Sequence, residues 1–429
     1  MFYDHLPPLN AYATRRGGLL AWLLRRPMEL PGALLLAAIV PLLLRYDLEV
    51  IETPTTRLET TALVALSILI SHLLVGRLSR YPGQDALSSI IPSVSMGFLA
   101  AIMIITLGHL SYSRTLLVSG FVITLAWYAL VASLRSRIIK PRLALVPLGG
   151  GRQLARLPQA QWVKLSSPAP VGDLSGTDGV VVDLDATLPD EWATFLVTCA
   201  TAGVPIYDSG RTREFMTGEV ELSHPGNIGL NTLLPQRGYL IAKRLLDTLV
   251  ALVLLPPTLT LIGLAALAIR IEDGGPIFYF QRRVGYRGRT FTCYKLRSMR
   301  AGAAGPAFTS EGDQRVTRVG RIIRKYRIDE LPQVFNILRG EMSWIGPRPE
   351  AEALAAEYER HIPYYAFRHA VKPGLTGWAA VRQGNVAEVE AATAKLRHDF
   401  FYIKNVSPSL DAFIAMKTTW IILTGFGSR

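Results

Sequence analysis

One segment organises this chain: Arg315–Glu350 reads RVTRVGRIIRKYRIDELPQVFNILRGEMSWIGPRPE. Arginine recurs at every third position from Arg315 to Arg327, and apolar residues fill most positions between. On a helix this spacing gives one cationic side and one apolar side. Two adjacent carboxylates, Asp329 and Glu330, follow directly. Carboxylates beside so much positive charge predict a site for phosphate groups and a metal ion at a membrane surface.

The acidic pair, Asp329 and Glu330, has a structural and a chemical interpretation. Acids at a helix N-terminus favour the helix dipole, and adjacent residues on a helix do not face the same way. At a helix start, however, both can converge on one Mg²⁺ ion, which typically takes one or two carboxylates plus substrate phosphates. A carboxylate can also attack phosphorus, as in aspartyl-phosphate enzymes. The pair is therefore a candidate catalytic and metal site.

Basic residues dominate the sequence around this pair, and only Glu311 and Asp313 oppose them. A solvated charged face explains alternating signs well, but charges of one sign repel one another. Guanidinium groups match phosphate oxygens through two parallel hydrogen bonds, so a diphosphate substrate fits better. The basic residues of this part are Arg282, Arg283, Arg287, Arg289, Lys295, Arg297, Arg300, Arg315, Arg318, Arg321, Arg324, Lys325 and Arg327.

Two proline-containing loops follow the acidic pair. Gly346–Pro349 (GPRP) is a stiff turn that fixes the direction of Arg348. Lys372–Trp378 (KPGLTGW) is another stiff loop, and Trp378 is expected as an exposed aromatic suited to a base or a sugar ring. Taken alone, these features predict phosphoryl transfer at a membrane surface and leave the substrates open.

An apolar run precedes this region: Leu245–Ile269 is long enough to span a bilayer, yet Pro256 and Pro257 lie at its centre. An internal proline costs a straight helix roughly 3 kcal/mol. Each half has about 11 residues and extends about 16 Å, which reaches only the middle of a bilayer. Basic residues flank both ends and favour a re-entrant membrane helix hairpin, residues 243–270, on the cytoplasmic face. The alternative is a kinked fifth span, which would place the arginine-rich segment outside.

Composition supports a membrane setting. The chain has 429 residues, of which 50% are hydrophobic and 18% charged, and its formal net charge is +13. Nucleic acid is one partner for such a charge, but long apolar segments favour anionic lipid headgroups and phosphorylated substrates. The two cysteines, Cys199 and Cys293, lie far apart in sequence, so neither a disulfide framework nor a zinc site is predicted.

Four transmembrane helices are predicted in the N-terminal region, residues 1–140. Arginines before the first span and lysine and arginine after the fourth place both ends of this unit in the cytoplasm. The first apolar run is displaced from the start and no small-residue cleavage site follows it, so a cleavable signal peptide is not expected. The expected spans are Met28–Arg45, Leu58–Leu78, Ala86–Leu110 and Thr115–Leu134.

Residues 141–235 predict a small α/β module with a Rossmann-like parallel sheet, and residues 236–429 form the remaining domain. Leu143–Leu148, Gly179–Asp183 and Val204–Tyr207 are the expected buried strands, and Asp190–Thr201 is the expected helix. Gly149–Gly151 follows the first strand as a dinucleotide-binding loop would, but its pattern is not GxGxxG. A structural or regulatory module is favoured over nucleotide binding.

Long motifs in residues 243–405 resemble the bacterial sugar transferase family, the monotopic phosphoglycosyl transferases. The N-terminal spans and the α/β module are similar to those of the large form of that family, whose mainly α catalytic domain carries a re-entrant helix. The matching stretches are Lys243–Asp247, Gly275–Phe278, Gln281, Arg283–Gly285, Tyr294–Arg300, Arg315–Glu350, Pro373–Ala379 and Asp399–Tyr402.

The resemblance implies a specific reaction. Such enzymes move a hexose 1-phosphate from a UDP-hexose to undecaprenyl phosphate and release UMP, the first membrane step of exopolysaccharide, capsule or O-antigen synthesis. By motif, Asp329 is the nucleophile that forms a covalent phosphosugar intermediate. Glu330 would assist metal binding and proton transfer, and Mg²⁺ would be held by Asp329 and Glu330. Pro256 and Pro257 would form the kink of the re-entrant membrane helix.

The resemblance also assigns substrate contacts and a location. The catalytic domain is expected on the cytoplasmic face of the bacterial inner membrane, with glucose or galactose as the leading sugar and a homodimer as a further expectation. The implied phosphate-binding residues are Arg324, Arg348, Lys295, Arg297 and Arg283, and the implied nucleotide or sugar loop contains Pro349, Trp378 and Arg382.

The sequence departs from the family pattern in places and leaves two other classes open. Pro256 stands where serine is common, and Ala380 and Arg382 are atypical after Trp378. One alternative is a membrane glycosyltransferase that releases UDP, but the chain lacks a DxD motif beside a large Rossmann domain. The other is a non-catalytic assembly or regulatory protein, against which the intact acidic pair and Pro-Arg-Pro turn argue.

Overall fold

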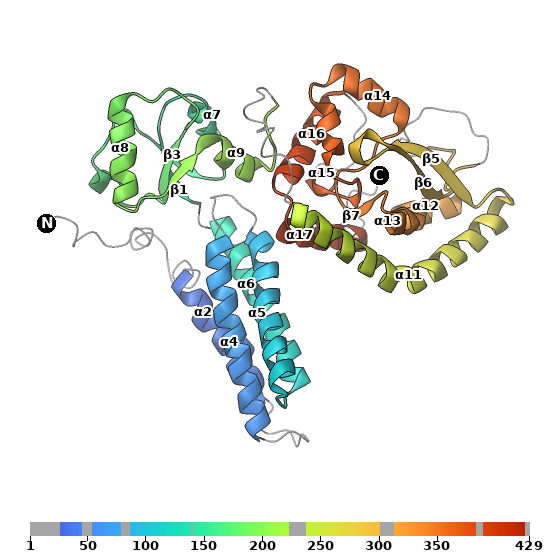
Figure 1. Ribbon diagram of the computed structural model, residues 1–429, viewed down its shortest axis with the longest axis horizontal. Helices are drawn as coiled ribbons and strands as arrows, with labels where there is room; N and C mark the ends of the chain where they lie inside the picture. Colours follow the sequence, from blue (N-terminus) through green and yellow to red (C-terminus); the bar gives the residue numbers. More distant parts are fainter. Residues whose placement is uncertain are drawn as a thin grey trace. The chain divides into compact units, whose positions relative to one another are not determined.

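The structure is a computed structural model that describes residues 26–44, 54–78, 86–138, 140–222, 237–300, 313–382 and 389–424. The chain divides into two compact units, Met1–Thr217 and Gly218–Arg429, and each is described by itself (Figure 1). The predicted boundary at residues 235 and 236 lies outside the described residues.

The first unit contains the N-terminal apolar helices. Those long and apolar enough to cross a membrane cover 55–75, 89–108 and 114–136, whereas the first predicted span forms a shorter apolar helix, Met28–Leu44. Pro31 lies inside this first helix, and a π-helical turn, η2, follows it. The elements are α2 (Arg26–Leu34), η2 (Leu35–Ile39), α3 (Val40–Leu44), α4 (Pro54–Leu78), α5 (Ala86–Gly108) and α6 (Arg114–Ile138).

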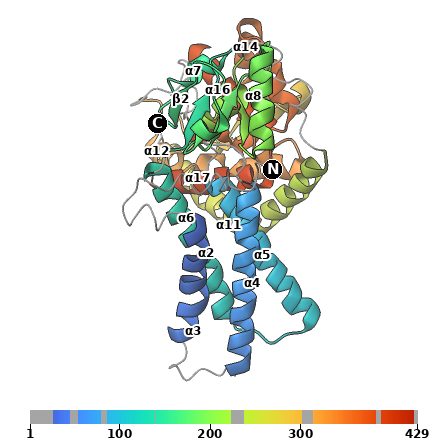
Figure 2. The same ribbon diagram turned by 90° about the vertical axis from the view of Figure 1, so that its left-hand side faces the viewer.

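The helices of this bundle pack through small and apolar residues. α4, α5 and α6 contact one another, and α2 contacts α4 and α6 (Figure 2). A Cβ at Gly97 would lie 2.4 Å from the Ser67 carbonyl oxygen, so glycine permits the close approach of α5 to α4. Hydroxyl groups such as those of Ser67 and Ser71 donate to carbonyls one turn earlier, which satisfies them where water is absent. The bundle therefore has the packing expected of membrane helices.

The rest of the first unit is a small α/β module with a four-stranded parallel sheet in the order β2-β1-β3-β4. The three predicted strands and the helix α8 (Asp190–Thr201) are confirmed. β2 was not predicted, because its residues are only partly buried and do not form an apolar run. The elements are β1 (Arg142–Leu145), α7 (Gly151–Leu154), β2 (Gln161–Lys164), η3 (Val171–Leu174), β3 (Gly179–Val182), α8, β4 (Ile206–Asp208) and α9 (Ser209–Thr217).

The second unit is mainly helical, with two small two-stranded sheets. β5 and β6 pair as an antiparallel hairpin, and β7 pairs with β8 in parallel. Its elements are α11 (Arg237–Asp273), β5 (Phe278–Val284), η4 (Tyr286–Gly288), β6 (Thr290–Leu296), α12 (Arg318–Lys325), η5 (Ile328–Gln333), α13 (Val334–Arg339), β7 (Ser343–Ile345), α14 (Glu352–His361), η6 (Tyr365–Ala370), β8 (Gly374–Thr376), α15 (Trp378–Arg382), α16 (Val389–Lys404) and α17 (Pro408–Thr424).

α11 is one continuous helix of 37 residues that contains Pro256 and Pro257. The sequence predicted a helix hairpin at residues 243–270, with two short helical halves separated at the prolines. In the structure the helix continues through both prolines. Figure 1 shows that it bends near its middle and that both halves run toward the rest of the unit. The Thr260 hydroxyl donates to the Pro256 carbonyl at 3.1 Å, one turn earlier in the same helix.

Candidate functional site

The acidic pair lies in a tight turn between two helices. The Thr317 hydroxyl accepts a hydrogen bond from the Gly320 amide at 2.8 Å, and this cap starts α12. The helix ends at Lys325, and Arg327 adopts a left-handed conformation with φ 57°. The 3₁₀ turn η5 then carries both acids.

The predicted helix was therefore longer than the real one. Arg315 precedes α12 and forms an ion pair with Asp313, while Arg327 lies in the turn beyond it. Arg318, Arg321 and Arg324 remain on the helix. The three-residue repeat of arginine thus combines a helical face with two turn positions.

Glu330 is buried and surrounded by cations. Its Oε1 accepts a hydrogen bond from the Lys295 ammonium at 3.0 Å, and the Arg348 guanidinium donates to both of its carboxylate oxygens. Arg327 lies 3.8 Å away. Burial opposes the charge, but these cations hold the pKa of Glu330 well below its usual range. Glu330 is therefore an ionised anchor for Arg348 and Lys295.

Asp329 has a different environment. It is buried, and its Oδ1 has no hydrogen-bond partner within the part of the chain that the structure describes. Burial and the negative charge of Glu330 raise the pKa of Asp329 to about 6, against the opposing effect of Lys295, Arg327 and Arg324. A buried carboxylate oxygen without a partner is costly unless a ligand completes it. Asp329 is thus the member of the pair that is available for chemistry.

The Gly346–Pro349 turn holds Arg348 in place. Ser343 and Ile345 of β7 pair with Gly374 and Thr376 of β8, and this pairing fixes the start of the turn. A Cβ at Gly346 would lie 2.4 Å from the Lys372 carbonyl oxygen, so only glycine allows this approach. The prediction that the turn gives Arg348 a fixed direction agrees with its paired bonds to Glu330.

Of the other predicted phosphate-binding residues, Arg324 lies near the acidic pair, whereas Arg283 and Arg297 bond to other parts of the unit. Arg324 lies at the end of α12, near enough to lower the pKa of Asp329. Arg283 on β5 bonds to Gln281 and to the Pro349 carbonyl, so it contacts the Pro-Arg-Pro turn rather than the acidic pair. Arg297 pairs with Asp273 at the end of α11, and two of its buried nitrogens have no partner among the described residues.

Comparison with known proteins shows the family of this chain. A family model described as Bacterial sugar transferase matches residues 238–425. A UDP-N-acetylgalactosamine-undecaprenyl-phosphate N-acetylgalactosaminephosphotransferase of Aeromonas hydrophila is 39% identical over 378 residues, which cover 87% of this chain and 88% of that protein. The chain belongs to the bacterial sugar transferase family.

Other relatives of this sugar transferase match less than half of the chain. A UDP-glucose:undecaprenyl-phosphate glucose-1-phosphate transferase of Caulobacter vibrioides is 42% identical over 214 residues, covering 47% of this chain and 80% of that protein. One with the same name from Escherichia coli is 36% identical over 196 residues, covering 45% of this chain and 40% of that protein. The match to the Aeromonas protein thus extends over far more of the chain than these two do.

The structure corrects one expectation about this sugar transferase. Trp378 is buried, stacks on Phe401 with ring centroids 5.2 Å apart, and donates its indole N–H to the Gly218 carbonyl at 2.7 Å. It is therefore a core residue, and the prediction of an exposed aromatic for a base or sugar is wrong. The Arg382 guanidinium lies 4.4 Å from the Trp378 ring, and the Pro349 carbonyl accepts a bond from Arg283.

Sequence reasoning missed a second buried charge cluster behind the Pro-Arg-Pro turn. Arg368 donates to the Arg348 carbonyl at 2.8 Å and to the Asp399 carboxylate at 2.8 Å. Lys395 and Arg368 form ion pairs with Glu350, the residue after the turn. The signal was present as charged residues within otherwise apolar stretches, such as Asp399 beside Phe400. Through the bond to the Arg348 carbonyl, this cluster stabilises the backbone of the Pro-Arg-Pro turn.

The donor set fits a metal ion only in part. Within the described residues no group of three or more His, Cys, Asp or Glu side chains could hold a metal ion. Asp329 offers an unpartnered oxygen, whereas both oxygens of Glu330 already accept hydrogen bonds from Arg348. Mg²⁺ often uses one carboxylate together with substrate phosphates, so Asp329 and a diphosphate would supply a suitable set.

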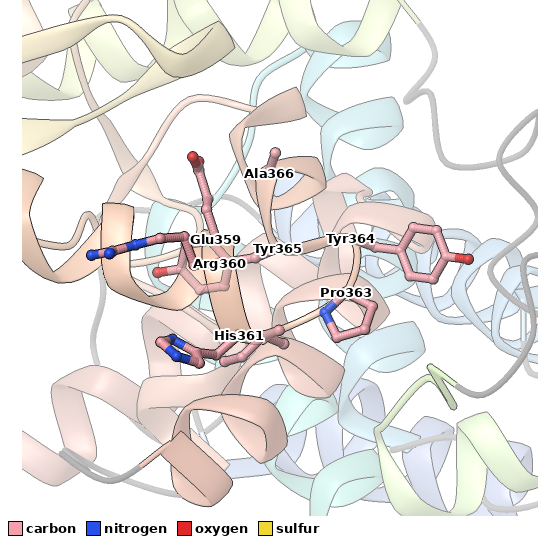
Figure 3. Close-up of a pocket in the computed structure, with 8 residues that line it drawn as sticks. Glu359, Arg360, His361, Pro363, Tyr364, Tyr365 and Ala366 are labelled. Atoms are coloured by element: carbon pink, nitrogen blue, oxygen red, sulfur yellow. The ribbon is translucent and has the colours of Figure 1, made fainter.

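Two other candidate sites carry no comparable chemistry. The Gly150 amide donates to Asp183 Oδ2 at 2.6 Å, so the glycine loop after β1 already binds a carboxylate of the chain itself. A hollow of about 390 Å³ lies over residues 359–366, and its side chains point in different directions, with Arg360 and Tyr364 on opposite sides (Figure 3). None of the predicted site residues lines this hollow.

Proposed function

We propose that this sugar transferase moves a sugar 1-phosphate from a UDP-sugar to undecaprenyl phosphate and releases UMP, as the first membrane step of a polysaccharide pathway. The observation that carries this proposal is the unpartnered Asp329 oxygen beside the cation-bound Glu330. The names of the Aeromonas and Caulobacter relatives, which combine a UDP-sugar with undecaprenyl phosphate, support the same reaction.

The reaction follows from the position of Asp329. Its carboxylate attacks the phosphorus that bears the sugar, the bond from that phosphorus to the bridging oxygen breaks, and UMP leaves with the electron pair. A phosphate oxygen of the acceptor lipid then attacks the phosphosugar on Asp329, which restores the carboxylate and gives the lipid diphosphosugar. Lys295, Arg324, Arg327 and Arg348 all act on the pair formed by Asp329 and Glu330, and their positive potential would offset the charge of a bound diphosphate.

Mg²⁺ is the proposed cofactor. When bound, it would neutralise charge that develops on the leaving phosphate. Asp329 is the protein ligand that the geometry favours. Ligation by Glu330, as the family motif implies, would require one of its bonds to Arg348 or Lys295 to be released. The role of Glu330 that these bonds support is to hold both cations toward the reacting phosphate.

The bent helix α11 supports a re-entrant membrane arrangement. In its first half, the Arg244 guanidinium donates to the carbonyls of Ile337 and Leu338 at the end of α13. In its second half, Glu272 accepts hydrogen bonds from the first amides of α12. Both ends of α11 therefore contact the same unit, whereas a spanning helix would separate its ends by a bilayer.

This arrangement supports a catalytic unit that lies on one side of the membrane. UDP-sugars are cytoplasmic metabolites in the reaction that the resemblance implies, so the proposed side is the cytoplasmic face of the bacterial inner membrane. The lysines and arginines that flank α11 and the N-terminal spans favour the same side. In this proposal the α/β module is Rossmann-like in fold and has a structural or regulatory role.

The test is nucleotide release by the full-length protein with undecaprenyl phosphate, Mg²⁺ and a panel of UDP-sugars. The panel contains UDP-N-acetylgalactosamine, UDP-glucose and UDP-galactose, because the relatives differ in the sugar that they are named for. We expect UMP release with one donor, and at least about a 1,000-fold loss in Asp329→Asn, since nucleophile removal typically costs that much or more.

A matched control replaces an exposed acid of the same unit. Glu352 forms an exposed ion pair with Arg282, so Glu352→Gln should retain UMP release. Mass spectrometry of the protein with donor alone should detect a phosphosugar adduct that is absent in Asp329→Asn. Release of UDP would instead indicate transfer of the sugar alone, and near-normal turnover of Asp329→Asn would exclude the covalent role.

A further inference from the structure

Three consecutive aromatic residues at the start of β5 are exposed. Phe278, Tyr279 and Phe280 have exposed fractions of 42%, 49% and 58%. Side chains alternate between the two faces of a strand, so a strand on a core exposes every second residue at most. At this end of the hairpin neither face is covered by the described part of the chain. An exposed run of large aromatics marks a surface that meets a partner.

These aromatics contact one another rather than the core. The rings of Phe278 and Phe280 stack with centroids 6.3 Å apart, and Tyr294 meets Phe280 edge-on at 5.7 Å. Tyr279 points to the other face, where its cross-strand partner is Lys295. The exposed cluster therefore begins on the face opposite the acidic pair and continues onto the face that carries Lys295.

The exposed aromatics continue the apolar surface of α11. The helix ends at Asp273 and β5 begins at Phe278, so the two surfaces are joined by four residues. In the second half of α11, Leu264, Leu267 and Ile271 are exposed. The opposite side of this half-helix is buried, and it packs on β6 and α12 through a cluster that contains Ile262, Ala265, Ile269, Leu296 and Ile323.

α12 adds a second exposed apolar strip with cations beside it. Ile322 on α12 and Tyr326, the residue directly after this helix, are exposed, with exposed fractions of 58% and 48%, and α12 contacts α11. Arg318, Arg321 and Lys325 are exposed on the same helix, which contains no acidic residue. Apolar and aromatic side chains flanked by exposed cations match a bilayer interface with anionic headgroups.

We propose that Phe278, Tyr279, Phe280, Ile322 and Tyr326 form an aromatic rim that inserts among the headgroups of an anionic bilayer, with Arg318, Arg321 and Lys325 on the lipid phosphates. The proposed binding partner of this rim is the bilayer surface and not another protein. Tyrosine rings suit this depth because they have an apolar body and a polar tip. The inference rests on the proposed membrane position of α11.

The rim would set the height of the acidic pair above the bilayer. Lys295 bonds to Glu330 and lies opposite Tyr279 in the hairpin register. Insertion of Tyr279 would therefore fix the distance of Lys295, and of the Glu330 carboxylate that it binds, from the headgroups. The phosphate of a membrane-bound acceptor lies at that same level.

Spin labels in the full-length protein can test the rim in nanodiscs that contain anionic or only zwitterionic lipid. Labels are attached at Phe280→Cys, at Leu264→Cys on α11 and at Val197→Cys, an exposed apolar residue on α8. Cys199 and Cys293 are buried, and the labelled wild-type chain gives their background. Accessibility to oxygen and to a water-soluble collision reagent reports the depth of each label.

We expect the Phe280 label to lie between the other two, about 5–10 Å below the headgroup surface in anionic nanodiscs. The double variant Arg318→Gln/Arg321→Gln should move this label toward water, and zwitterionic lipid should have the same effect. A Phe280 label as accessible to the water-soluble reagent as the Val197 label would overturn the rim.

A different result would assign the aromatic residues to a protein contact. If both reagents lose access at Phe280 and the labels broaden one another, a second copy of the chain covers the surface and the bilayer assignment is wrong. The Leu264 label separates this inference from the proposed function. A Leu264 label in water would refute the membrane position of α11 itself, whereas lipid at Leu264 and water at Phe280 would refute only the rim.

Discussion

The glycine loop after β1 and the turn that carries the acidic pair differ in what their carboxylates bind. At the loop, Asp183, which follows β3, accepts hydrogen bonds from the Gly150 amide at 2.6 Å and the Asp185 amide at 3.1 Å. In the turn, Asp329 is buried with an oxygen that has no partner among the described residues. Both regions were candidate phosphate sites in the sequence.

The difference separates a structural carboxylate from a chemical one. Asp183 fills the place that a phosphate would take over the glycine loop, and its bonds stabilise the local backbone. Asp329 Oδ1 has no partner among the described residues, whereas Glu330 accepts hydrogen bonds from Lys295 and Arg348. Burial and the negative charge of Glu330 raise the pKa of Asp329. A buried group with a shifted pKa beside fixed cations is typical of an active site.

The largest change in the free energy of unfolding is expected when a cation that binds Glu330 is removed. Arg348→Ala should lower the free energy of unfolding by about 3–5 kcal/mol, because it removes the main partner of a buried carboxylate. UMP release should fall with it. Thermal unfolding of the detergent-solubilised protein, followed beside the nucleotide assay, measures both.

The matched control for this change is an exposed arginine. Arg282→Ala removes a surface ion pair with Glu352 and should change stability by less than about 1 kcal/mol. Arg348→Lys should lie between the two, since an ammonium keeps the charge but cannot make the paired bonds. Equal stability of Arg348→Ala and Arg282→Ala would show that Glu330 does not depend on Arg348.

Replacement of Asp329 is expected to change the free energy of unfolding by a smaller amount and to increase it. The pKa of Asp329 is raised to about 6, so the folded state binds its proton more tightly than the unfolded state does. Stability should therefore increase as the pH falls through 6 toward 4, and the ionised group costs about 1–3 kcal/mol at pH 7. Asp329→Asn should thus be inactive yet more stable than the wild type at pH 7.

The pH dependence provides the control for this prediction. The stability difference between Asp329→Asn and the wild type should disappear below about pH 4, where Asp329 is protonated in both states. Activity should show the reverse trend, because the nucleophile must be ionised, and UMP release should rise through pH 6. A variant that is less stable at pH 7 would mean that a partner of Asp329 had been removed.

Sequence reasoning succeeded where a structure depends on local composition. The long apolar helices and α8, whose two ends were placed correctly, follow from runs of residues that are adjacent in the chain. The acidic pair and Arg348 were both singled out within one continuous motif. The bond from Lys295 to Glu330 joins residues 35 positions apart and could be anticipated only as an excess of positive charge.

The failures concern contacts made by distant segments. Trp378 was expected to be exposed, but Phe401 and Phe413 cover it and the Gly218 carbonyl binds its N–H. The ion pair of Arg297 with Asp273 at the end of α11 was likewise not anticipated, while its role as a phosphate ligand stays a prediction. Neither partner can be identified from spacing, because burial is decided when separate elements pack together.

The smallest effect is expected in the glycine loop. Asp183→Ala should destabilise the first unit by about 1–2 kcal/mol, because the Gly150 amide loses a charged acceptor. UMP release should stay within about twofold of the wild type, since the glycine loop takes no part in the proposed reaction. Asp185→Ala is the matched control, because Asp185 follows β3 as Asp183 does and keeps its backbone amide. Isothermal titration of the wild type with UDP or NAD should give no heat from this module. Nucleotide binding that disappears when Gly149 is replaced would reverse the comparison, because the loop would then bind a phosphate in place of Asp183.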